Sequence, residues 1–520
     1  MQKRSWLAIL GCLALTSAAC GAGPSERPEV AVEQNSPGEV AESDSAAPEQ
    51  ATLPLQVPAT DLAWTECTDS TLDGLGLTAR TPGLILECAG FEAPVDASGQ
   101  MFGSFEVGTM RARLNITPED SAPLVFTSGS DRSSIETLAD MAAGPSSTLL
   151  AAHPIVAVDR RGIGRSAAVD CVDVGTRGPL SDLGQFERSD GDIVDRAVTV
   201  GRDATIQCTD LLQPQELAFG TSYAADDLEQ LRLAWGVDAL GIVGTGNGAA
   251  TALAYAAQYS DRVARLILDS PAGVGIDRMT AAEQKTQGRE AAFAAFAQRC
   301  LALQCSLGPD PLAAVKNVIG VASGGGFAPI SAHGVLDGIA YALASTSGDS
   351  SQRALELSDT LSAANAGDAG RLRALAARAS DAYDTDGQFV ARCTDGQSWP
   401  SPQTVRDVSA AWADLYPVFG TDAALAALTC SSWPTAPPAP LPTTLTVPVL
   451  QLSGSADPVV GSGGFGSVTG LVASTGAPSS AMTWQGSGHP MLGGSQCAQA
   501  AAVAYASDGT LPPNGSVCPA

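Results

Sequence analysis

The stretch LGIVGTGNGAATALAYA, residues 240–256, decides the fold of this chain. An apolar strand pattern runs into closely spaced glycines, and an alanine-rich helix pattern follows. Two interpretations compete. Gly244, Gly246 and Ala249 fit a dinucleotide fingerprint, in which a pyrophosphate rests on the helix N-terminus. Gly244, Gly246 and Gly248 fit a nucleophile elbow instead, a tight strand-to-helix turn whose central residue attacks the substrate. That central position is Gly246, which has no side chain.

The dinucleotide interpretation is the weaker one, although it stays open. It assigns Asp269, at the end of the next strand, to a ribose hydroxyl, but Asp269 comes later than the usual spacing of about twenty residues. The fingerprint also normally opens a domain, whereas more than a hundred residues of folded chain are expected before Gly244. The elbow interpretation has neither difficulty.

Further apolar runs predict a parallel sheet, because each ends in small or acidic residues and alternates with helical patterns. The runs are APLVFTSGS (122–130), HPIVAVDRRG (153–162), VARLILDSP (263–271), VPVLQLSGSADP (447–458) and SAMTWQGSGHP (480–490). The rhythm breaks between Gly275 and Pro442, where the composition is helical. We therefore expect an α/β class, with a mostly parallel, doubly wound sheet and an inserted helical cap.

Two residues near the end of the chain fit the elbow. Asp457 follows the strand in VPVLQLSGSADP, where its carboxylate can orient an imidazole, and His489 follows the next strand within glycines. A hydrolase with an elbow requires the chain order nucleophile, acid, histidine. An isolated aspartate or histidine is usually structural, but this order at these two loops favours a catalytic pair.

Several motifs together make the chain resemble the tripeptidyl aminopeptidase and proline iminopeptidase group of α/β hydrolases over nearly its whole mature length. These are ECAGFEAPVD near residue 87, DRRGIGRS (159–166), TSYAADDLEQLRLAWG (221–236), CLALQCSLG (300–308), SADPV (455–459), and GHPMLGGSQC with DGTLPPNGSVC near the end. The resemblance implies an α/β-hydrolase fold with Gly246 at the nucleophile position, Asp457 as acid and His489 as base. It implies an oxyanion hole from Asn247 and the loop near Gly129.

The chain departs from this family in two places. Gly246 carries no nucleophile, and TSGSDRS stands at residues 127–133, where the family typically has a Gly-Gly-Pro-Gly loop. Glycine suits the strained turn, but losing the serine of a comparable hydrolase costs on the order of a millionfold in turnover. We therefore expect an impaired serine-exopeptidase relative that binds a peptide or small ligand under the cap.

The alternative is an active hydrolase or aminopeptidase that uses Asp457 and His489 with a relocated nucleophile or a water. Thr245 is adjacent, but an elbow is expected to present only its central side chain to the base. Ser128 and Ser130 are further candidates, although loop serines commonly form turns. A dinucleotide-binding protein remains the least favoured reading.

The N-terminus has the features of an export signal. Lys3 and Arg4 precede a short apolar run, and small residues precede Cys20, as in a bacterial lipobox. We expect a lipoprotein signal over residues 1–20, acylation of Cys20, and a disordered linker over 21–60 that is rich in Pro, Glu, Ser and Ala. An ordinary secretory signal is the competing interpretation. The expected location is the outer face of the cell membrane, with the lipid as the only membrane contact.

The net charge bears on the class of partner, and the cysteines bear on disulfides. The net charge of −27 makes nucleic acid an unsuitable partner. Ten cysteines remain besides Cys12 and Cys20, and an even number in an exported chain indicates disulfides. The spacing favours sequential pairs, while sequence leaves connectivity open: Cys67 with Cys88, Cys171 with Cys208, Cys300 with Cys305, Cys393 with Cys430, and Cys497 with Cys518. No cofactor or metal site is expected. The predicted hydrolase core covers 61–274 and 443–520, and the cap covers 275–442.

Overall fold

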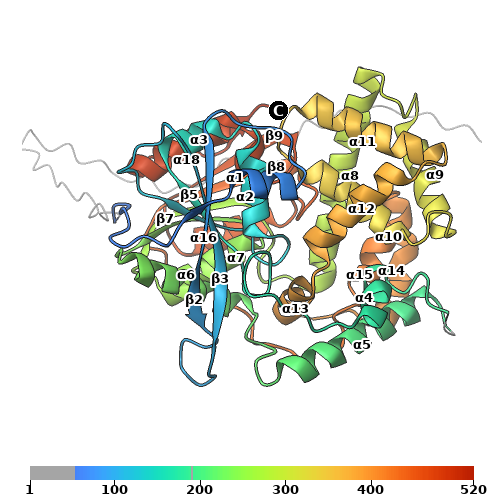
Figure 1. Ribbon diagram of the computed structural model, residues 1–520, viewed down its shortest axis with the longest axis horizontal. Coiled ribbons are helices and arrows are strands. Elements are labelled where there is room, and N and C mark those ends of the chain that lie inside the picture. Colours follow the sequence, from blue (N-terminus) through green and yellow to red (C-terminus); the bar gives the residue numbers. More distant parts are fainter. Residues whose placement is uncertain (1–52, 189–190, 397) are drawn as a thin grey trace, which may run out of the picture. The chain divides into compact units, whose positions relative to one another are not determined.

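Ten strands of the described residues form one sheet (Figure 1). The structure is a computed structural model that describes residues 53–188, 191–396 and 398–520. The strands lie in the order β1-β2-β3-β5-β4-β6-β7-β8-β9-β10. Their bounds are β1 Thr65–Glu66, β2 Leu84–Pro94, β3 Ser104–Leu114, β4 Leu124–Thr127, β5 Ile155–Val158, β6 Leu240–Gly246, β7 Val263–Pro271, β8 Val449–Ala456, β9 Ser479–Ser487 and β10 Ser516–Cys518.

The sheet is parallel from β5 through β10. Strands β4 to β9 are the apolar runs predicted from the sequence. Strands β2 and β3, which pair antiparallel along their whole length, were not predicted. Charged residues interrupt their apolar pattern and meet across the pair, where Arg111 Nε donates to Glu87 at 2.8 Å. The predicted class, a mostly parallel sheet with helices, is confirmed.

Helices cover both faces of the sheet because side chains alternate along each strand. In β7, Ile267 packs on one face, while Leu266 and Leu268 pack on the other. The first face is covered by α2 Ser134–Ala142, α3 Ser147–Ala152, α17 Met491–Gly494 and α18 Gln496–Asp508. The second is covered by α6 Thr221–Trp235, α7 Gly248–Gln258 and α16 Phe465–Ser474. The short helix α1 Thr68–Gly74 lies beside β2.

A helical lobe between β7 and β8 forms the cap, and Figure 1 shows it beside the sheet. Its helices are α8 Arg278–Leu303, α9 Pro311–Ser323, α10 Ala332–Ala344, α11 Ser350–Asn365, α12 Gly370–Tyr383, α13 Asp386–Asp395, α14 Pro402–Leu415 and α15 Gly420–Ala426. Phe293 and Phe296 of α8 pack into the largest apolar cluster of this lobe. The insertion lies within the residues predicted for the cap.

Two helices outside the insertion also belong to the cap. α4 Val174–Ser181 and α5 Ile193–Leu212 come from the segment that was predicted as core, yet Figure 1 shows them beside α13, α14 and α15. Val194 of α5 shares an apolar cluster with Trp412 of α14, because the amphipathic α5 buries its apolar stripe there. The cap therefore includes α4 and α5 as well as the predicted residues 275–442, and the segment 61–274 is not all core.

The predicted linker over residues 21–60 also has to be corrected at its C-terminal end. Residues 53–60 are hydrogen-bonded to the core: Gln56 Nε2 donates to Asp238 at 2.8 Å, and the Ala59 N–H donates to the Trp235 carbonyl at 2.9 Å. These bonds tie the end of the predicted linker to the end of α6. The predicted signal, Cys20 and residues 21–52 lie outside the described residues. Over the described ranges, no helix has the length and apolar character needed to cross a membrane.

The five predicted disulfides are confirmed. The bonded pairs are Cys67–Cys88, Cys171–Cys208, Cys300–Cys305, Cys393–Cys430 and Cys497–Cys518. Two of them, each closing 37 residues, share one apolar cluster with Phe219 and Trp433. They therefore fasten α5 and α13 around the same part of the cap.

Candidate active site

The turn after β6 has the backbone of an elbow. β6 ends at Gly246, which has a φ of +55°, and α7 begins two residues later at Gly248. This left-handed conformation is strained for residues with a Cβ and costs glycine nothing. A Cβ on Gly248 would collide with the carbonyl of Thr127, so the helix start is pressed against β4. The strand, turn and helix thus match the elbow interpretation of this stretch.

The structure brings Asp457 and His489 together as a buried pair. His489 Nδ1 lies 2.7 Å from Asp457 Oδ2, and the two residues are 2% and 1% exposed. The other oxygen, Asp457 Oδ1, accepts the backbone N–H groups of Val459 at 2.8 Å and Val460 at 3.1 Å. Because the carboxylate is acceptor-only, Nδ1 donates to it, and Nε2 of the neutral ring is an acceptor.

Nε2 of His489 faces the position where a nucleophile would stand. A Cβ built on Gly246 would lie 3.3 Å from His489 Nε2 and 3.6 Å from Val460 Cγ1. The residues expected as nucleophile position, acid and base therefore meet in one place, although they come from three separate loops. What is missing is the attacking hydroxyl.

A different hydroxyl contacts Nε2 of His489. Thr245 Oγ1 lies 3.2 Å from His489 Nε2, and Thr245 is fully buried. The expectation that an elbow presents only its central side chain to the base is wrong for this residue. Strand alternation puts Thr245 on the same face as Val243, which packs in one cluster with Met491 and Leu492 of the histidine loop. The histidine ring is thus within reach of the threonine hydroxyl.

The predicted oxyanion elements are also adjacent. Gly129 follows β4 with a φ of +70°, and a Cβ on it would lie 2.5 Å from the carbonyl carbon of Asn247. Asn247 Nδ2 donates to Ser130 Oγ at 3.4 Å, which links the elbow to this loop. Ser128 Oγ donates to the Arg132 carbonyl at 2.8 Å and so closes a turn. Neither serine is hydrogen-bonded to His489 within the described part of the chain.

Asp269 has a structural role that the dinucleotide interpretation did not anticipate. It is fully buried, and its carboxylate accepts the N–H groups of Met491 at 3.0 Å and Leu492 at 2.9 Å. Burial raises the pKa of Asp269 to about 6. Its oxygens hold the loop that carries His489. The carboxylate that the dinucleotide interpretation assigned to a ribose hydroxyl therefore already accepts backbone N–H groups of the protein.

The DRRG motif holds core and cap together rather than supplying chemistry. Arg161 Nε donates to Asp227 Oδ2 at 2.9 Å, and both residues are buried. Arg160 Nη1 donates to Asp395 Oδ2 at 2.6 Å, which ties the loop after β5 to the end of α13. The sequence identified this motif only through its resemblance to the family. It could not show the ion pairs, because Asp227 and Asp395 are far from the motif along the chain.

A cavity of about 1180 Å³ lies between the cap and the core. On the core side Ser130, Asn247 and Val460 line it, whereas Gly246 and His489 are not among its lining residues. Cap residues supply many charged groups to its walls, including Lys285 and His333, and sequence reasoning had singled out neither of them. The Asp457–His489 pair therefore does not line the cavity, whereas Val460, whose N–H donates to Asp457, does.

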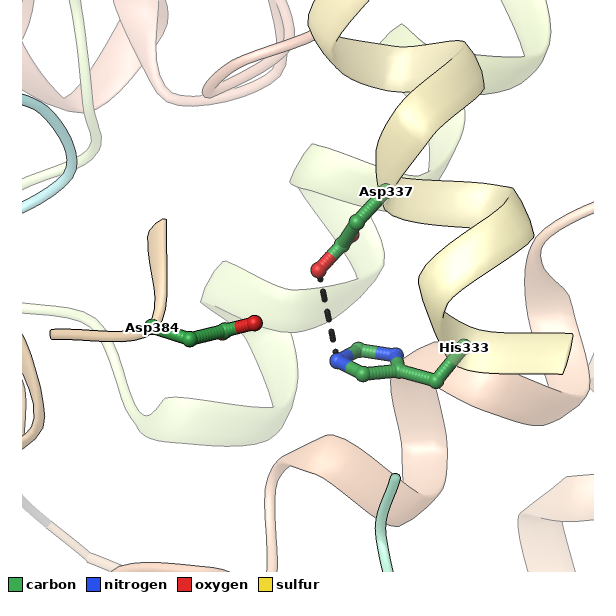
Figure 2. A group of neighbouring side chains, drawn as sticks. All are labelled: His333, Asp337 and Asp384. Atoms are coloured by element: carbon green, nitrogen blue, oxygen red, sulfur yellow. Dashed lines mark ion pairs between the residues drawn. The ribbon is translucent and has the colours of Figure 1, made fainter. Parts of the chain in front are cut away.

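His333, Asp337 and Asp384 form the one group among the described residues whose side chains are placed to hold a metal ion (Figure 2). His333 lies 3.3 Å from Asp337 through Nε2 and 2.8 Å from Asp422 through Nδ1. Burial opposes its charge, but Asp422 and Asp337 outweigh burial and raise the pKa of His333 to about 10. A protonated ring has no free ligand atom, so the contacts are those of an ion-pair network.

Sequence comparisons connect the chain to known families. The family model described as "alpha/beta hydrolase fold" matches residues 139–304, and that described as "TAP-like protein" matches residues 416–518. The serine protease Hip1 of Mycobacterium tuberculosis is 34% identical over 112 residues, which are 21% of this chain and 22% of that protein. The match thus spans less than a quarter of Hip1.

Solved structures are similar at low identity. A proline iminopeptidase from Mycobacterium smegmatis is 13% identical with a TM-score of 0.38, over 80% of this chain and 97% of that one. The esterase RhEst1 from Rhodococcus sp. ECU1013 is 14% identical with a TM-score of 0.31, over 76% of this chain and 90% of that one.

Proposed function

Because the chain belongs to the α/β hydrolases of the TAP-like family, we propose that it retains the scaffold of a serine exopeptidase but acts by binding, with little or no hydrolysis. A peptide or small molecule would occupy the cavity of about 1180 Å³ beneath the cap. One observation carries this proposal. Gly246 offers no hydroxyl at the position whose Cβ would stand 3.3 Å from His489 Nε2.

The acyl-enzyme route needs a nucleophile whose proton the histidine can take. Without it, turnover falls on the order of a millionfold, and what remains comes from the oxyanion hole and from binding. Here Nε2 of His489 has a resident partner in Thr245 at 3.2 Å, so a water would have to displace that contact before it could be activated.

Hydrolysis of peptide and ester substrates tests this proposal directly. The wild-type chain should show no turnover of alanyl-peptide amides or p-nitrophenyl esters above that of a His489→Ala variant. A serine-reactive fluorophosphonate should leave both proteins unlabelled. Turnover that His489→Ala abolishes would contradict the binding function.

The second candidate is an active hydrolase with a relocated nucleophile, and the Thr245–His489 contact favours it over attack by Ser128 or Ser130. Its difficulty is access, because Thr245 is fully buried and is not among the residues lining the cavity. Peptide mapping of a fluorophosphonate-treated sample separates the candidates: an adduct on Thr245 supports the second one, and an unmodified chain supports the first.

The proposal includes a place for the protein outside the cell. The lipobox-like residues before Cys20 support lipid attachment at that cysteine, and thus anchoring to the outer face of the bacterial membrane. Metabolic labelling with an alkyne fatty acid should mark the wild-type chain and fail with Cys20→Ala. If the variant is still labelled, or remains in the membrane fraction, this assignment is wrong.

A further inference from the structure

Three basic side chains in the cavity have no carboxylate partner among the described residues. They are Arg278 and Lys285 of α8 and Arg392 of α13, and all three line the same cavity. Arg278 lies over the Trp399 ring at 5.2 Å, and Arg392 Nη1 donates to the Tyr383 carbonyl at 2.7 Å. The ammonium of Lys285 has no hydrogen bond or ion pair in the described ranges. We refer to these three residues as the basic patch.

The other cations that line this cavity are paired. Arg177 lies 2.9 Å from Asp386, Arg289 lies 2.9 Å from Asp337, and His333 lies 2.8 Å from Asp422. The basic patch is therefore an exception within one cavity.

The patch lies close to the catalytic pair. A Cβ on Gly288 of α8 would collide with the Asp457 carbonyl, so α8 presses on the acid loop one turn after Lys285. Asp131, in the altered loop after β4, also lines the cavity, and its Oδ2 is buried without a hydrogen-bond partner. Its charge influences both Arg278 and Lys285. Other aspartates also line the cavity, but within the described ranges none of them forms an ion pair with the three cations of the basic patch.

Arg392 repels both Arg278 and Lys285, and all three side chains are half-buried. Like charges held together without an ion-pair partner are costly unless an anion compensates them. A guanidinium offers two parallel N–H donors that match the two oxygens of a carboxylate, and an aromatic ring beneath it fixes its plane. Arg278 over Trp399 has this arrangement. An ammonium adds a strong point charge from a flexible stem.

We propose that the basic patch of Arg278, Lys285 and Arg392 binds the carboxylate of the ligand, so that the cavity takes acidic peptides or small carboxylic acids. This inference rests on the proposed binding function and names its ligand class. The carboxylate is a peptide C-terminus or an acidic side chain, and both present the same two oxygens.

Isothermal titration calorimetry of the full chain tests the inference with two pairs of peptides and with inorganic phosphate. Acetyl-trialanine with a free carboxylate should bind at least tenfold tighter than its C-terminal amide. Acetyl-Ala-Glu-Ala-amide, compared with its glutamine counterpart, tests the side-chain source. Preferential binding of inorganic phosphate over all the carboxylates would overturn the inference. Equal affinity for the acid and amide forms, or no binding of either acid at about 10 mM, would overturn it as well.

Variants separate the patch from general folding effects. Lys285→Met and Arg278→Gln should each reduce the preference for acid over amide at least fivefold, while Arg371→Gln on the exposed face of α12 should leave it unchanged. Lys285→Met should also raise the melting temperature of the unliganded protein, because it removes an unpaired charge from the half-buried wall of the cavity. A lower melting temperature would show a structural role and contradict the inference.

The two proposals fail in different ways. If acid and amide bind equally, the cavity still binds ligands, and only the role of the patch is lost. If the protein hydrolyses substrates and His489→Ala abolishes this activity, the proposed binding function is wrong. The measured affinities for acid and amide peptides still decide whether the basic patch prefers carboxylates.

Discussion

Thr245 donates its hydroxyl toward Nε2 of His489 across 3.2 Å, from the residue directly before the missing nucleophile. Asp457 holds Nδ1 of the same ring at 2.7 Å, so both ring nitrogens are satisfied inside the protein. A histidine whose two nitrogens have buried partners is stable without a substrate. This explains how the pair persists structurally beside Gly246.

Replacing Thr245 by valine tests this contact. Thr245→Val keeps the shape but leaves the buried Nε2 without a partner, so the free energy of unfolding should fall by about 1–3 kcal/mol. Urea denaturation measures the change. Thr251→Val is the matched control, because the Thr251 hydroxyl is buried without a hydrogen-bond partner and its loss should cost nothing. Equal losses in the two variants would refute the role of Thr245.

Restoring the nucleophile should have two opposite effects. Gly246→Ser places a Cβ at a φ of +55° and 3.3 Å from His489 Nε2, so stability should fall by about 1–2 kcal/mol. Labelling by a fluorophosphonate should appear at the same time, because Asp457 and His489 are in place to activate the new hydroxyl. Mass spectrometry with Gly246→Ser/His489→Ala as control measures it. Labelling that survives the loss of His489 would show that the pair is not functional.

Thr245 should then limit the restored serine. In Gly246→Ser the two hydroxyls compete for one acceptor, His489 Nε2. The double variant Gly246→Ser/Thr245→Val should therefore label severalfold faster than Gly246→Ser alone. An unchanged or slower rate, with the fold intact by circular dichroism, would mean that Thr245 positions the ring instead of competing for it.

Binding of a carboxylate should weaken as pH rises from 7 to 9. Burial and the charge of Arg289 lower the pKa of Lys285 to about 8, while Asp131 and Asp337 act in the opposite direction and Arg392 adds to the lowering. A lysine with a lowered pKa is charged below that value and loses its charge as pH rises through it. Calorimetry of acetyl-trialanine across this range measures the loss. Lys285→Arg should flatten the profile, because arginine stays charged.

The buried pair of Arg161 and Asp227 should be essential for stability. Asp227→Ala leaves a guanidinium uncompensated in the interior, which costs about 3–5 kcal/mol. The exposed pair of Arg202 and Asp203, 3.5 Å apart, provides the control, since Asp203→Ala should cost less than about 1 kcal/mol. Chemical denaturation that gives similar values for both variants would contradict this assignment.

The sequence by itself determined the features that depend on short-range patterns. Apolar runs predicted β4 to β9, the glycines around Gly246 predicted the turn, and the order of Asp457 and His489 predicted their meeting. The disulfides could be paired because each joins cysteines that follow one another along the chain. Strand periodicity and turn chemistry are local properties, so they are readable without coordinates.

Only the tertiary structure decided which distant side chains meet. The contact between Thr245 and His489 joins residues 244 positions apart, and Asp269 reaches Met491 from another strand. The packing of α5 on the cap likewise joins helices that are far apart in the sequence, and so does the grouping of Lys285 with Arg392. Hydrogen bonds and charges act over a few ångströms in space, and no spacing in the sequence specifies which surfaces the packed helices and strands present to one another.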